Sequence, residues 1–257
     1  LVWLVSAPLR LSRWMFGVDE SKLQSQTAHA LAAYEEGHWQ RARKALVKIA
    51  QRSQNPLVFY LMAARASHNL GEPEKVDEFL AAATKASPSG SMAISLTQAQ
   101  LQLVDGALEN CLATLIRAQA IDEEHPKVVQ MLAEVYEGLS DWPSLYALVP
   151  QLKKVGLEET KVAHFTAVSA KGLLLTSAEI SIDDLNKQWR QFSAITRRSG
   201  IVLVAYAEQL RRLGEAKQAI KPLKEFLRET PAQARILLQF ADTATESDAA
   251  DPRQFNS

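Results

Sequence analysis

The chain has 257 residues, of which 29 are basic, 29 are acidic and 47% are hydrophobic. This balance is ordinary for a folded protein and leaves no excess of positive charge to attract nucleic acid. The single cysteine, Cys111, excludes a disulfide framework, a site built from several cysteines and a CxxCH haem-attachment motif. With only ten glycines and ten prolines, the composition favours helix throughout.

The N-terminal segment, residues 1–16, is apolar, and Arg10 and Arg13 are its only charged residues. Its leading apolar run is much shorter than the about 20 residues that a helix needs to cross a bilayer. Two interpretations are open. The segment is either a helix that packs on the rest of the protein or the end of a transmembrane helix with arginine and tryptophan at the interface.

A short motif then returns along the chain. Gly37, Gly71, Gly106 and Ser140 are separated by 34, 35 and 34 residues, and Gly214 follows 74 residues later. Seven residues before each of these positions lies a small residue: Ala30, Ala64, Ala99, Ala133 and Ala207. Two residues after each lies a residue that is aromatic or apolar in most units: Trp39, Pro73, Leu108, Trp142 and Ala216.

This spacing predicts pairs of antiparallel helices. The first helix of each pair ends near the glycine, which can adopt the left-handed turn conformation, and the second helix follows a short turn. The small residue allows the two helices to approach closely, and proline separates successive pairs. A single pair cannot bury its own apolar face, so neighbouring pairs are expected to stack.

The predicted class is therefore all-α, an α-solenoid of helix hairpins that resemble tetratricopeptide repeats. Four repeats occupy residues 17–156, and a fifth repeat with a terminal helix occupies 201–245. Residues 157–200 are a degenerate helical unit, with one helix over 158–175 and another over 181–200. Ser181 is the expected N-cap of the latter, with Asp184 three residues on. The polar residues 246–257 are expected to form a flexible tail.

Two stretches carry a more specific resemblance, "YLMAARA" (60–66) and "LSDWPSLYALVPQLKK" (139–154). They resemble the HemY family, bacterial inner-membrane proteins with tetratricopeptide repeats that are associated with haem biosynthesis. The resemblance implies two N-terminal transmembrane helices that are missing from this chain apart from the end of the second one. It also implies repeats that face the cytoplasm and partners among the haem-biosynthesis enzymes. Two features depart from the family: "GVDESKLQSQTA" has one lysine where an arginine-rich segment is expected, and further C-terminal repeats are missing.

The sequence offers little support for catalysis. GxSxG, GxxxxGK[ST], GxGxxG and zinc-binding patterns are absent. Adjacent acidic residues, such as Glu35 and Glu36, point about 100° apart on a helix and do not face each other. We therefore expect the protein not to be an enzyme and to hold no metal. Of the five histidines, His68 is the leading candidate for a haem ligand, because it lies on the predicted concave side, although no cofactor is required by the sequence.

A surface is the more favoured site, since the first helices line the inner groove in this class of repeat. A groove of mixed polar and apolar side chains suits an extended peptide or a partner helix. The alternative is that these residues are simply solvated. The predicted groove residues are Tyr34, Arg65, His68, Asn69, Gln100, Glu134, Glu137, Glu208, Arg211 and Arg212.

The resulting hypothesis is a non-catalytic, membrane-tethered scaffold that binds proteins and, by family resemblance, acts in late haem biosynthesis. Three alternatives remain open. The protein could be a carrier that binds haem or porphyrin, an enzyme of the same pathway, or a general envelope-assembly adaptor unrelated to haem.

Overall fold

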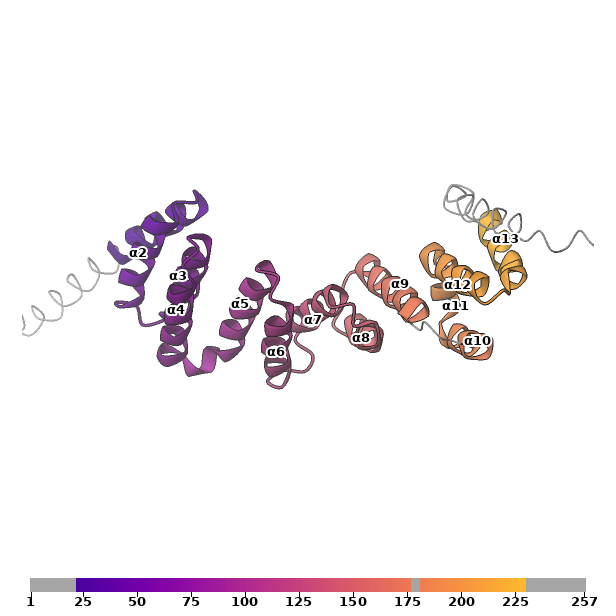
Figure 1. The fold of residues 1–257 in the computed structure, drawn as a ribbon. Coiled ribbons are helices and arrows are strands. Elements are labelled where there is room, and N and C mark those ends of the chain that lie inside the picture. Colours follow the sequence, from indigo (N-terminus) through magenta and orange to yellow (C-terminus); the bar gives the residue numbers. More distant parts are fainter. Residues whose placement is uncertain (1–21, 177–180, 230–257) are drawn as a thin grey trace, which may run out of the picture. The chain divides into compact units, whose positions relative to one another are not determined.

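The computed structural model describes residues 22–176 and 181–229. Every regular element in these ranges is helical (Figure 1). The predictions for the apolar segment 1–16, for the terminal helix within 230–245 and for the tail 246–257 lie outside the described residues. The chain divides into two compact units, Leu1–Glu123 and Glu124–Ser257, and we describe each by itself.

Unit 1 begins with a helix over residues 22–35. It continues with α2 (Trp39–Ala50), α3 (Leu57–Asn69), α4 (Pro73–Ala86), the short 3-10 turn η1 (Pro88–Gly90), α5 (Ser91–Val104) and α6 (Leu108–Gln119). Helices next to each other in the sequence pack together, as α2 does on α3, α3 on α4 and α5 on α6. In addition, α3 contacts α5, the first helix of the next pair. The unit is therefore a series of helix hairpins in sequence order.

Unit 2 contains α7 (Pro126–Gly138), α8 (Trp142–Lys154), α9 (Glu159–Thr176), α10 (Ile182–Gln191), α11 (Ala194–Arg197), α12 (Gly200–Arg212), the 3-10 turn η2 (Ala216–Ala219) and α13 (Ile220–Glu229). Here α8 packs on both α7 and α9. Helix α9 packs on α12, and the shorter helices α10 and α11 lie between them in the sequence, so the hairpin pattern is interrupted over residues 181–199.

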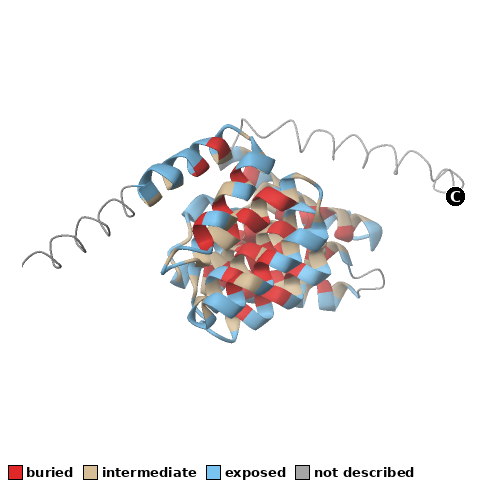
Figure 2. Ribbon diagram, turned by 90° about the vertical axis from the view of Figure 1, so that its left-hand side faces the viewer, coloured by how far each residue is buried: buried red, intermediate tan, exposed pale blue. Residues whose placement is uncertain are grey.

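The small residues of the repeat occupy the predicted interior positions. Ala30, Ala64, Ala99, Ala133 and Ala207 are all buried, and each lies in the first helix of its pair. A methyl group at this position lets the neighbouring helix approach closely, as the sequence predicts. Figure 2 shows the buried residues in red on the helix faces that turn toward other helices.

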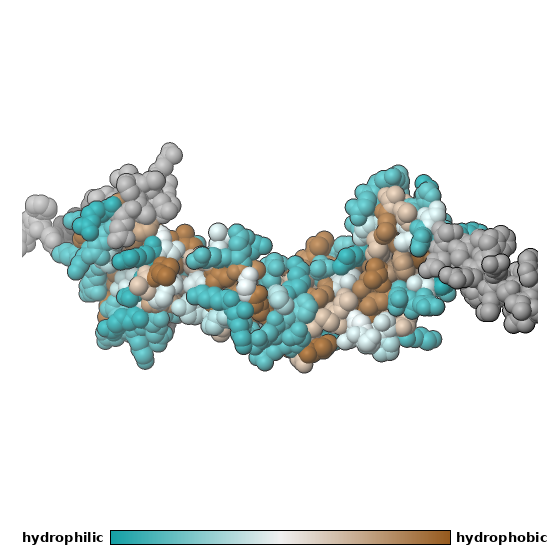
Figure 3. All heavy atoms as spheres, turned by 180° about the vertical axis from the view of Figure 1, so that it is seen from behind, coloured by the Kyte–Doolittle hydropathy of each residue, from teal (hydrophilic) through white to brown (hydrophobic). Residues whose placement is uncertain are grey.

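The surface is mainly hydrophilic, as the view from behind in Figure 3 shows, with apolar side chains in separate patches. The most exposed large apolar side chains in the described ranges include Val58, Val104 and Ile195. These three lie on different helices, and single exposed apolar residues of this kind are normal for a protein surface.

The hairpin turns depend on left-handed backbone conformation. Gly71 and Gly106 have a φ of +70° and Gly214 has a φ of +77°. At the first of these turns, the Gly71 amide donates to the His68 carbonyl at 2.9 Å, and the next amide, that of Glu72, reaches back to Ser67 at 3.0 Å. These two bonds satisfy carbonyls at the end of α3, which is how a helix with a left-handed residue after it commonly ends.

Ser140 occupies the same position as these glycines and has a φ of +57°. The left-handed conformation costs a residue with a Cβ roughly 1–2 kcal/mol, whereas glycine loses about 0.4–1 kcal/mol through its freer unfolded state. We therefore expect Ser140→Gly to raise the free energy of unfolding by about 0.5–1 kcal/mol, measured by urea denaturation. The reverse change, Gly106→Ser, should lower it, and a fall in stability for Ser140→Gly would contradict the assigned turn.

Two sequence-based expectations differ from the structure. Residues 181–200 were expected to form one helix, but α10 ends at Gln191 and α11 begins at Ala194. Ser181 does cap α10, since its hydroxyl accepts from the Asp184 amide at 3.2 Å. However, Phe192 is extended and buried, and Ser193 starts a new helix by accepting from the Thr196 amide at 3.1 Å. A second cap and a buried aromatic residue therefore outweigh continuation of the helix.

The prolines also act differently from the expectation. Pro126 is the first residue of α7, and Pro56 directly precedes α3. Pro88 begins the 3-10 turn that precedes α5. They therefore start the following hairpin, where the missing amide is harmless and the fixed φ suits a helix.

Candidate functional site

The predicted groove residues of unit 1 are connected from one hairpin to the next. Arg65 on α3 donates from Nη2 to Oε1 of Gln100 on α5 at 2.7 Å, and the same nitrogen lies 3.5 Å from the Thr97 hydroxyl. Asn69, one turn along α3, donates to the Arg65 carbonyl at 3.0 Å. A polar face therefore runs from α3 to α5, and we call the residues Tyr34, Arg65, His68, Asn69, Gln100 and Asp105 the first-helix face.

Tyr34 joins this face from the helix over 22–35. Its ring makes an edge-to-face contact with Trp39, with centroids 5.1 Å apart, and this geometry is favourable for aromatic pairs. Burial raises the pKa of the Tyr34 phenol, and the positive charge of Arg65 acts in the opposite direction. Arg65 therefore binds Gln100 directly and influences Tyr34 through its charge.

His68 is held by a second contact between hairpins. Its Nε2 lies 2.7 Å from Oδ1 of Asp105, and the His68 side chain is 19% exposed. The pair borders a pocket of about 370 Å³ whose lining includes Val76, Leu80 and Leu101. Since Nε2 already pairs with a carboxylate, His68 would have to leave Asp105 to coordinate a haem iron through this nitrogen. The geometry favours a structural and surface role for His68.

In unit 2, the predicted residues form separate local pairs. Oε1 of Glu137 on α7 lies 2.9 Å from Nε2 of His164 on α9. This contact connects two first helices, as Arg65 does in unit 1. Glu134 accepts from the Gln130 amide on its own helix at 2.8 Å. His164 was not predicted to contribute, and its separation of 27 residues from Glu137 is shorter than one repeat.

The three predicted residues of α12 bind one another. Glu208 Oε1 lies 2.9 Å from Nη2 of Arg211 and 3.0 Å from Nε of Arg212. The hydrogen bond from Arg211 holds the pKa of the Glu208 carboxyl below its ordinary value and raises the pKa of Arg211. One carboxylate is thus paired with two guanidinium groups. These three side chains together therefore carry a net positive charge.

Arg43 is a residue whose role the sequence did not indicate. It lies on α2, donates to the Ser67 hydroxyl at 3.3 Å and forms an ion pair with Glu72. The hydrogen bond from Arg43 lowers the pKa of the Glu72 carboxyl. Arg43 therefore connects the first hairpin to the second. Its partner is 29 residues away, a spacing that matches no motif.

The chemistry of the described residues does not point to a reactive centre. Within 22–176 and 181–229, no group of three His, Cys, Asp or Glu side chains is placed to hold a metal ion. Cys111 is buried, and its Sγ lies 3.2 Å from the Ala99 carbonyl oxygen. None of the helices in those ranges is both long enough and apolar enough to span a bilayer.

The fold and site together define a class: an all-helical protein of sequential helix hairpins that carries extended polar faces. Comparison with known proteins shows similarity to one family. Residues 1–71 match the family model described as HemY protein N-terminus. The chain is 26% identical over 200 residues to the protein named Protein HemY from Escherichia coli (strain K12), and equally to those from Escherichia coli O157:H7 and Shigella flexneri. The chain is therefore similar to HemY proteins, and its residues 1–71 are similar to their N-terminal region.

The similarity covers 77% of this chain and 50% of each of those relatives. The chain therefore spans about half the length of the curated relatives that it matches.

Proposed function

We propose that this chain is a non-catalytic protein-interaction scaffold, built as an α-solenoid of tetratricopeptide-like hairpins. Sequential packing of the helix pairs, the buried alanine in each first helix and the left-handed residue at each turn support this architecture. In such a solenoid the first helices of successive repeats share one face, and that face is available to another molecule.

The observation that carries the proposal is the first-helix face. Arg65, on the second hairpin, donates to Gln100 on the third, and its charge acts on the Tyr34 phenol of the first. His68 and Asp105 make a second link between α3 and α5. The groups are ordered by one another, are only partly buried and present both charge and hydrogen-bonding capacity. A partner peptide or helix could therefore bind without the cost of first ordering them.

The family similarity supports a role in late haem biosynthesis, with the enzymes of its last steps as partners. It also supports attachment to the bacterial inner membrane through the N-terminal region, with the hairpins on the cytoplasmic side. A carrier of haem or porphyrin is the second candidate. In this structure the Nε2 atom of His68 is paired with Asp105, so a ligand role at this nitrogen would require that contact to break.

The test is a pull-down with the full chain as bait and purified ferrochelatase, together with the oxidase that precedes it, as prey. We expect at least one of the two to co-elute. Arg65→Glu should reduce its recovery by about tenfold or more, because it replaces the Arg65 cation with a repulsive charge. Lys85→Glu makes the same change in charge at an exposed position of α4 and should leave recovery unchanged, while melting curves verify that both variants are folded.

Absence of both enzymes from the wild-type eluate would contradict the proposed partners. Equal loss of binding in both folded variants would contradict the assigned face. Conversion of a porphyrin precursor by the purified chain without any partner would overturn the non-catalytic assignment.

A further inference from the structure

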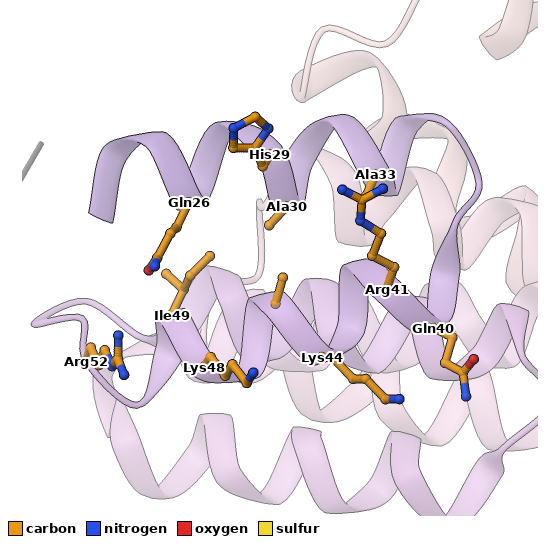
Figure 4. A pocket seen from close by; sticks show the side chains of 11 residues that line it. Gln26, His29, Ala30, Ala33, Gln40, Arg41, Lys44, Lys48, Ile49 and Arg52 are labelled. Carbon is orange, nitrogen blue, oxygen red and sulfur yellow. The ribbon is translucent and has the colours of Figure 1, made fainter. Parts of the chain in front are cut away.

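A second surface lies on the first hairpin and shares no residue with the first-helix face. The helix over 22–35 and α2 leave a trough of about 770 Å³ between them. Figure 4 shows Ala30 on the upper helix and Ile49 on α2 pointing into the trough from opposite sides. Both residues are almost fully buried, at 1% and 2% exposed, so they close the base of the trough. The apolar surface that an occupant would meet is the half-buried Ala45 and the aliphatic parts of the basic side chains.

One edge of the trough is a line of positive charge. Arg41, Lys44, Lys48 and Arg52 line it, and all four are exposed. Their spacing of three, four and four residues places the first three on one side of α2, with Arg52 continuing the line beyond the end of the helix. At about 1.5 Å per residue, the line extends for roughly 16 Å. We call these four residues the basic stripe.

The basic stripe has no balancing carboxylate among the described residues. The trough lining contains no Asp or Glu, and none of the ion pairs of the described residues involves the stripe. Arg43 on the same helix shows the contrast, because it is mostly buried and is paired with Glu72. Like charges four residues apart on a helix repel each other, so a bound anion would relieve repulsion that the isolated hairpin retains.

The shape of the trough decides which anion fits. A bilayer surface would contact only the tips of the lysine and arginine side chains and would leave the hollow unfilled. An amphipathic helix can place carboxylates against the stripe and apolar side chains against Ala45 and the aliphatic parts of the lysine and arginine side chains at once. We propose that the trough binds an acidic amphipathic segment of a partner protein, with carboxylates spaced to match the basic stripe.

The test uses the full chain and a labelled 20-residue helical peptide that carries glutamate at positions i, i+3, i+7 and i+11 and alanine or leucine on the adjoining face. Fluorescence anisotropy should detect binding that weakens as salt is added. Lys44→Glu/Lys48→Glu should lower the affinity by about tenfold or more. The matched control, Lys85→Glu/Lys161→Glu, makes the same change in net charge at exposed residues outside the trough and should bind as the wild type does.

A scrambled peptide of the same composition should bind at least about fivefold more weakly if the spacing and the apolar face matter. Equal affinity for both peptides would reduce the interaction to unspecific charge attraction and overturn the proposal. Binding to vesicles that contain phosphatidylglycerol, without binding to the peptide, would also overturn the proposal. Peptide binding seen only after deletion of residues 246–257 would overturn it as well, because the acidic tail of this chain would then be the occupant. None of these outcomes depends on haem-biosynthesis enzymes, so this test and that of the first-helix face can fail separately.

Discussion

Gly172→Ala should be among the most destabilising single-methyl changes in unit 2. Gly172 lies within α9, where alanine would ordinarily stabilise a helix by about 1 kcal/mol relative to glycine. However, a Cβ at this position would lie 2.2 Å from Cδ2 and 2.3 Å from Cγ of Trp142. These atoms are in the part of the indole nearest its backbone, so a side-chain rotation cannot easily move them away. Overpacking of this kind costs about 1–3 kcal/mol, so after the gain from alanine we expect a net loss of about 1 kcal/mol.

The measurement is the free energy of unfolding from urea denaturation, followed by tryptophan fluorescence and by far-UV circular dichroism. Gly90→Ala is the matched control. Its Cβ would approach Cδ2 of Leu57 at 2.5 Å, but that atom is the end of a flexible side chain, so we expect a change of less than about 0.5 kcal/mol. In the background of Trp142→Leu, the cost of Gly172→Ala should shrink. If Gly172→Ala were as stable as the wild type, α8 and α9 would not pack as described.

The parts of the fold that the sequence predicts well are those set by local backbone physics. A glycine at a fixed interval indicates a residue with left-handed backbone conformation, and Gly71 and Gly106 both have that conformation. The alanine seven residues earlier reports a close helix contact, and Ala64 and Ala99 are buried as expected. Both signals involve residues whose size or backbone freedom alone decides the structure, so they can be read without knowledge of distant partners.

The break at Phe192 was missed for a related reason. The helical period continues through 181–200, but Ser193 with Thr196 is also a local start signal, and the two signals conflict. Burial of Phe192, which contacts Tyr146 with ring centroids 5.5 Å apart, decides between them. That contact joins residues 46 positions apart in the sequence, and the periodicity of a short segment contains no information about it.

Some contacts of the candidate site could likewise be predicted from the sequence, and others could not. The register of the repeat placed Arg65 and Gln100 on the same face, and they form a hydrogen bond across 35 residues, close to one repeat. The partner of His68 could have been found by looking one repeat ahead, where Asp105 lies 37 residues on. The pairing of Arg43 with Glu72 could not have been found in this way, because it depends on how two long side chains extend between hairpins. The basic stripe was not predicted: its spacing is present in the sequence, but its lack of acidic neighbours among the described residues required the structure.

The second large effect concerns the core of unit 1. We expect Leu115→Ala to lower the free energy of unfolding by about 3 kcal/mol, the middle of the range for removing a buried leucine. Leu115 lies on α6, is 0% exposed and occupies the repeat position that Leu46 occupies on α2. Its neighbour Ile116 is 46% exposed, so Ile116→Ala should cost less than about 1 kcal/mol. Both changes remove a similar apolar side chain from the same helix, and only its orientation differs.

Urea denaturation and amide hydrogen exchange within α5 and α6 would measure both losses of stability. Equal losses for the two variants would mean that α6 does not turn its repeat face toward α5, and the hairpin assignment of unit 1 would fail with it.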